Sequence, residues 1–156
     1  MENGRSELRA RYYREQLAAA GRAAAALRSS YERVRQRFPL PDPIPEGLAV
    51  ELEALTARFA RLADLLVQKL FRAQDALLLE DEGSLLDRLN RAEKRGQIAS
   101  AEQWREIREL RNQISHEYVL EDLRELFEAV FRFAPLLLDA VERAHRDDRY
   151  PGTDGE

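Results

Sequence analysis

The segment 111–118 carries the densest set of reactive side chains in this sequence of 156 residues, reading Arg-Asn-Gln-Ile-Ser-His-Glu-Tyr. An apolar stripe at helical spacing, formed by Trp104, Ile107 and Ile114, places Arg111 in line with residues expected to be buried. A charged group in such a position needs a partner or a chemical function, because burying an isolated charge is costly. The segment is therefore the candidate site.

A helix through this segment would gather four functional side chains. At about 100° per residue, Arg111 and Tyr118 lie on nearly the same face, and Asn112 and His116 share an adjacent one. A purely structural explanation is also open: Arg111 pairs with a carboxylate of another helix, His116 lies near a helix C-terminus whose dipole favours its charge, and Tyr118 packs in the core. Spacing alone does not separate the two interpretations.

Composition limits the chemistry that these residues can perform. The chain has no cysteine and two histidines, His116 and His145, so thiol nucleophiles and cysteine-ligated metals are excluded. The sequence contains no HExxH motif, no histidine pair at helical spacing and no glycine-rich phosphate loop, and we expect neither a metal nor a cofactor. His145, near the end of the last predicted helix, is expected to be solvated. His116 is then the candidate for proton transfer at neutral pH.

Charge and hydropathy bear on partners and location. The formal net charge of -4 argues against a generally basic nucleic-acid coat but leaves room for a local basic patch. The N-terminus is charged, and no uncharged run approaches the roughly 18 residues of a membrane span. We expect a cytoplasmic protein that does not bind membranes.

The elements that must position the segment are helices. Apolar residues recur at steps of three and four, and strand-like alternation is lacking. Ser84 and Ser100 are placed to cap helices, with Gly96 ending the one between them. The predicted helices are about 6–38, a second whose stripe runs from 48 to 77, a short one between 84 and 96, a fourth from 100 to about 118, and a last one at 121–146.

These elements predict an all-α, up-and-down bundle of about five helices. Residues 1–146 form a single helical domain, with a proline-rich linker at 39–45 between the first and second helices. Residues 147–156 are expected to be a disordered tail.

The candidate segment resembles a known family. The spacing of Arg111, His116 and Tyr118 matches the Arg-X4-His-X-Tyr motif of the HEPN superfamily. Within that superfamily it resembles the HepT-like toxins of the MNT-HEPN toxin–antitoxin systems. Asn112 fits the polar residue that usually follows the arginine. Similarity to HepT-like and related substrate-binding proteins extends to 61–64 and 85–90. It covers roughly 45–146, while residues 1–40 are longer and richer in alanine than a minimal HEPN core.

The resemblance implies a HEPN-like homodimer in which two copies of the motif share one composite cleft. It implies a metal-independent endoribonuclease acting on an RNA such as a tRNA or mRNA, with His116 as acid or base, Arg111 as the clamp for the extra negative charge of the phosphorane, and Asn112 orienting histidine or substrate. It further implies a type VII-like pair in which a nucleotidyltransferase antitoxin adenylylates Tyr118 and so blocks the cleft.

Two other functions are compatible with the sequence. The same wider group includes non-catalytic substrate-binding subunits of minimal nucleotidyltransferases, which the chain also resembles. In such a subunit the strip of helix surface that carries Arg111, Asn112, His116 and Tyr118 would form an interface or bind a ligand. A helical dimer with a scaffolding role and a fortuitous motif is the third.

Overall fold

The structure is a computed structural model that describes residues 2–116, 123–147 and 149–150. Its helices run without strands through the described part of the chain, which confirms the all-α prediction. Because α2, η2 and α3 follow one another without a break, they form one rod, and the rods number five. The elements are α1 (Glu2–Val34), the 3₁₀ turn η1 (Arg35–Arg37), α2 (Glu46–Asp64), the π-helical segment η2 (Leu65–Leu70), α3 (Phe71–Leu77), α4 (Leu85–Lys94), α5 (Ala101–Ser115) and α6 (Leu123–Arg146).

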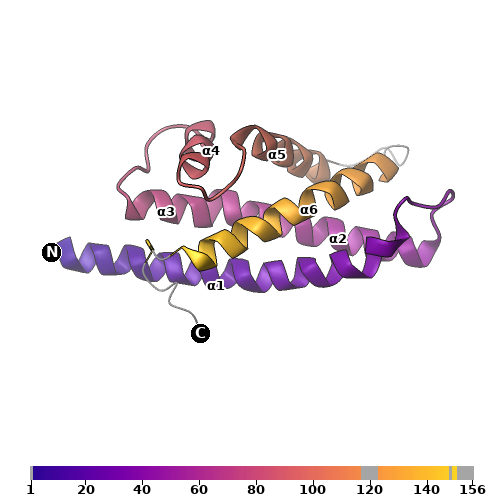
Figure 1. Ribbon diagram of the computed structural model, residues 1–156, viewed down its shortest axis with the longest axis horizontal. Coiled ribbons are helices and arrows are strands. Elements are labelled where there is room, and N and C mark those ends of the chain that lie inside the picture. The colour runs from indigo at the N-terminus through magenta and orange to yellow at the C-terminus, as the bar shows by residue number, and fades with distance from the viewer. Residues whose placement is uncertain (1, 117–122, 148, 151–156) are drawn as a thin grey trace.

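The rods lie mostly lengthwise along the molecule and reverse direction along the chain, as predicted (Figure 1). The long helix α1 packs against the rod α2–η2–α3 and against α6, and α2 also contacts α6. Helix α5 packs on α2, α4 and α6, so it lies on the side of the bundle away from α1 in Figure 1. None of the described helices has the length and apolar character needed to cross a membrane.

The apolar stripes predicted from the sequence are the buried faces of these helices. On the rod α2–η2–α3, every predicted stripe residue from Leu48 to Ala73 is buried, and Leu77 is partly buried. On α1 the alanines at positions 20 and 24 are buried together with Leu17 and Leu27, which explains how so alanine-rich a helix packs closely in the bundle. Each large apolar side chain buried in this way contributes roughly 1.5–3 kcal/mol to folding.

Helix ends follow the predicted capping residues. The Ser84 hydroxyl accepts the Asp87 backbone N–H at 3.2 Å, and the Asp87 carboxylate accepts the Ser84 N–H at 2.8 Å, a complete capping box. The Ser100 hydroxyl accepts the backbone N–H of Gln103 at 3.2 Å. Gly96, just beyond α4, has a φ of 77°, a conformation that glycine adopts without strain.

The predicted end of the fourth helix is wrong. Helix α5 stops at Ser115, and His116 has φ and ψ of −88° and 143°, which is extended backbone. The His116 N–H bonds to the carbonyl of Gln113, three residues back, at 3.2 Å, and this tighter turn closes the helix. His116 therefore does not share a helical face with Asn112, and Tyr118 lies outside the described residues.

The predicted disordered tail differs from the structure at Tyr150. This side chain is 2% exposed, and its ring lies 5.1 Å from the buried ring of Tyr13 on α1. The Arg149 guanidinium donates to the carbonyl of Arg95 at 2.7 Å and also pairs with Asp147. An aromatic ring and an arginine thus hold this stretch against the bundle, a contact that its polar sequence did not reveal.

A buried charged cluster joins α3 to α4. Asp75 is 1% exposed, and its carboxylate lies 2.6 Å from Arg95, 2.9 Å from Arg91 and 3.9 Å from Arg88. The neighbouring Gln74 donates its amide to Gln97 at 2.7 Å. The Asp75 carboxylate is therefore the counter-charge for three arginines, and these four side chains together carry a net positive charge.

Candidate functional site

Arg111 is held by a carboxylate from the second rod. Its Nε and Nη2 donate to the two oxygens of Asp64, the last residue of α2, at 2.9 and 2.8 Å, a bidentate pair. Its Nη1 also donates to the Ser115 hydroxyl one turn further along α5. The side chains of Arg111 and Asp64 are 26% and 47% exposed, so the pair lies at the surface and solvent reaches it.

The pairing of Arg111 is the one that the structural explanation predicted, a carboxylate on another helix. It does not by itself decide between a structural and a functional arginine, because a fixed guanidinium also suits anion binding. The π-helical segment η2 begins directly after Asp64, and such segments occur often at functional sites. A cavity of about 600 Å³ lies beside the pair and is lined by Arg61, Asp64, Leu65, Gln68 and Lys69.

Asn112 faces a different side of α5. It lines a surface cavity of about 370 Å³ between α4 and α5, together with Arg105 and Arg108 of its own helix. No hydrogen bond joins its side chain to Arg111 or His116 in the described structure. The predicted role of Asn112 in orienting the histidine is therefore not seen within one subunit.

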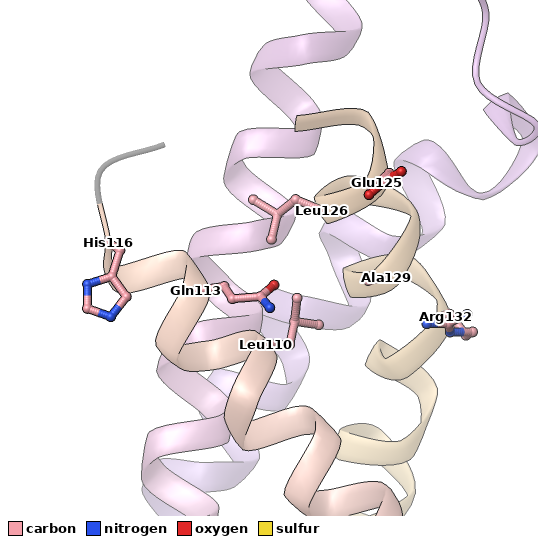
Figure 2. A pocket seen from close by; sticks show the side chains of 7 residues that line it. All are labelled: Leu110, Gln113, His116, Glu125, Leu126, Ala129 and Arg132. Atoms are coloured by element: carbon pink, nitrogen blue, oxygen red, sulfur yellow. The ribbon is translucent and has the colours of Figure 1, made fainter. Parts of the chain in front are cut away.

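His116 lies at the exposed C-terminal end of α5. It borders a cavity of about 510 Å³ between the end of α5 and the start of α6, whose lining includes Gln113 and Arg132. Figure 2 shows Gln113 pointing into the space between the two helices, whereas the His116 ring turns away from the other labelled side chains. Among the described residues the His116 side chain is exposed, and no side chain that lines this cavity forms a hydrogen bond with its ring.

Taken together, the predicted strip is divided among three sides of one helix end. Arg111 faces α2, Asn112 faces α4, and His116 lies beside the start of α6. The strip fails because it assumed an unbroken helix to Tyr118, whereas α5 ends before His116. The three residues do share the same end of the bundle.

The second histidine lies far from this end. His145 is near the C-terminus of α6, a helix of 24 residues that begins beside His116 and spans roughly 36 Å. Its Nδ1 is 2.9 Å from the Val141 carbonyl, so that nitrogen is the donor. The ring rests beside Gly21 of α1, and its half of the molecule is separate from the candidate site.

Sequence reasoning missed the partners of the candidate residues. Asp64 was noted only as part of a resemblance, and Gln113 and Arg132 were not singled out. Asp64 lies two positions after the buried stripe residue Leu62, and its side chain is half-exposed. A carboxylate at such a position can reach a neighbouring helix, but spacing does not identify the helix.

Within the described ranges, no three His, Asp or Glu side chains gather in a way that would hold a metal ion. In the comparison with known proteins, no family model, curated protein or solved structure matches this chain. The HEPN resemblance of the motif therefore stays a prediction, and the function below is argued from the site.

Proposed function

We propose that the protein is a metal-independent endoribonuclease toxin that acts as a homodimer and is neutralised by a nucleotidyltransferase antitoxin. The observation that carries this proposal is that the two described motif residues with catalytic potential, Arg111 and His116, lie at the same solvent-exposed end of α5. Arg111 is also held in a fixed orientation there, which is the condition for stabilising a charge that develops during a reaction.

The chemistry of these two side chains suits RNA cleavage without a metal. The ribose 2′-OH must lose a proton, the leaving 5′-oxygen must gain one, and the phosphorane between them carries extra negative charge. An exposed imidazole can exchange the protons, and a guanidinium can bind the phosphorane oxygens with a forked pair of donors.

The proposed dimer brings a second copy of the motif to the site. Among the labelled residues in Figure 2 the His116 ring turns away from Gln113 and Arg132, an orientation that suits neighbours from a second subunit. A two-fold axis near the ends of two α5 helices brings two copies of Arg111 and His116 to one cleft. The proposed antitoxin transfers AMP from ATP to the Tyr118 phenol oxygen, two residues after His116, releasing pyrophosphate and the phenol proton, and the added phosphate repels RNA from that cleft.

The test is cleavage of RNA by the purified full-length chain in the presence of a metal chelator. We expect cleavage by the wild type and a loss of at least about a hundredfold in rate for Arg111→Ala. Arg5→Ala removes an exposed arginine from the distant end of α1 and should retain the wild-type rate. Intact RNA with the wild-type dimer, or equal rates for both variants, contradicts the proposal.

A second candidate is favoured by the bidentate pair itself. Because Asp64 already occupies two donors of Arg111, the pair also fits a purely structural role in a non-catalytic subunit that binds a minimal nucleotidyltransferase. Expression without that partner separates the two functions. Growth arrest that depends on Arg111 supports the toxin, whereas stable co-purification with the nucleotidyltransferase and no growth arrest supports the subunit.

A further inference from the structure

A groove runs between α4 and α5 and includes one residue of the candidate segment, Asn112. Three leucines of α4 form one wall, and Arg105, Arg108, Glu109 and Asn112 of α5 form the other. The four α5 side chains of this cavity are exposed, and Leu86 on the opposite wall is 41% exposed. We call this cavity the α4–α5 groove.

The polar wall leads towards the motif. Arg105, Arg108 and Asn112 follow one another at steps of three and four, so they form one row on α5. The row spans about 10 Å along the helix. Its last member, Asn112, is next to Arg111 in the chain but faces α4, whereas Arg111 faces α2, so the groove lies beside the candidate site on a neighbouring side of the same helix end.

The lining of the groove carries two arginines against one glutamate, whereas the chain as a whole has a net charge of -4. Arg88 of α4 is 16% exposed, and burial is the main reason that its pKa is lowered; Arg72, Arg91 and Arg108 lower it further, while Asp75 opposes them. Asp75 is shared with Arg91 and Arg95, and within the groove wall Glu109 alone is acidic. Within its lining, the groove therefore has more positive than negative charge.

We propose that the α4–α5 groove binds the backbone of single-stranded RNA, with Arg105 and Arg108 contacting phosphates and the exposed Leu86 packing against sugars and bases. Guanidinium groups bind phosphates bidentately, and single-stranded RNA offers unstacked apolar base faces. A protein helix is a poorer occupant, because a cylinder about 10 Å across and as long as the row takes up roughly twice the cavity's volume of about 370 Å³. This inference rests on the proposed function, since it assigns the RNA a binding surface beside the site.

Binding can be measured separately from cleavage. The probe is a fluorescently labelled oligouridine, and its affinity for the full chain is followed by anisotropy in a His116→Ala background, so that cleavage does not consume it. Arg105→Ala with Arg108→Ala should weaken binding about tenfold or more at low salt. The slope of log affinity against log salt should become shallower by about 1.4, since each phosphate contact on a single strand contributes about 0.7.

The matched control is Arg5→Ala with Arg14→Ala, which removes the same charge from exposed positions on α1 and should change affinity less than twofold. Circular dichroism checks that both double variants are folded. Equal weakening by the two pairs, or unchanged affinity in the groove variant, overturns the inference. Unchanged RNA affinity together with lost binding of the nucleotidyltransferase would instead assign the groove to a protein partner.

The binding and cleavage measurements distinguish a failure of the groove assignment from a failure of the proposed function. If the groove variant loses RNA affinity while the wild type cleaves no RNA, the groove assignment stands and the ribonuclease proposal fails. If the wild type cleaves RNA and the groove variant binds it normally, the ribonuclease proposal stands and the groove assignment fails.

Discussion

At the scale of single residues, the same kind of ion pair has different consequences in different surroundings. The pair of Arg111 with Asp64 is partly exposed, so water screens it and it contributes modestly to stability. Asp75 is buried beneath three arginines, and the arginine side chains are only 8–22% exposed. The first arrangement presents a charge to solvent, whereas the second holds α3 and α4 together.

Asp75→Ala should lower the free energy of unfolding by about 3–5 kcal/mol, because it leaves buried guanidinium groups without their counter-charge. Asp75→Asn keeps an acceptor and should cost less. Glu142→Ala removes the carboxylate from the exposed pair with Arg28 and should leave stability within experimental error. Denaturant unfolding measures all three, and equal stability of the Asp75 and Glu142 variants would contradict the assignment.

Sequence spacing predicts the burial of residues better than it predicts the pairing of charged residues. The stripe containing Trp104 and Ile107 was predicted and is buried. The partner of Arg111 was not predictable, because Asp64 lies 47 positions earlier and helical periodicity gives a face but not a neighbour. The same holds for Asp75 and its arginines.

At the scale of elements, the starts of helices were easier to predict from the sequence than the end of α5. Ser84 and Ser100 begin helices because their hydroxyls accept backbone N–H groups, and both were recognisable in the sequence. The end of α5 carries no glycine or proline, so the pattern extended past Ser115 to Tyr118. The residues of η2 likewise show no pattern that predicts a π-helical segment.

The contact of Tyr150 with α1 makes stability sensitive to alkaline pH. Burial raises the pKa of Tyr13 well above its usual value, with a smaller opposing effect of Gln74, and burial also raises the pKa of Tyr150. The folded protein therefore favours the neutral phenols. This stabilisation is fully present below the unfolded-state pKa of about 10 and is lost as the pH rises above it.

Tyr13→Phe should flatten the fall in stability above about pH 10, because it removes one of the phenols that must ionise on unfolding. The control is Tyr12→Phe, an adjacent tyrosine that is 44% exposed, which should keep the wild-type profile. Urea unfolding at a series of pH values measures the effect. Identical slopes for the two variants would show that the burial of Tyr13 does not govern the alkaline transition.

At the scale of the whole molecule, the two histidines lie at opposite ends of α6. The cavity beside the start of α6 includes His116, and His145 is in the last turn of that helix. The proposed chemistry belongs to the end where α5 stops, where Arg111 is fixed and His116 is exposed. Fold class and core follow from composition and periodicity, whereas the proposed cleft depends on a second subunit, which periodicity within one chain does not define.

The pair of histidines offers the most direct measurement of the central claim. The rate of RNA cleavage is compared between His116→Ala and His145→Ala, both as full-length protein, in chelator and at the same protein concentration. We expect His116→Ala to lose about two to four orders of magnitude, the contribution of a general acid or base, and His145→Ala to keep the wild-type rate. Equal rates for the two variants would contradict the assignment of the catalytic histidine and the ribonuclease mechanism built on it.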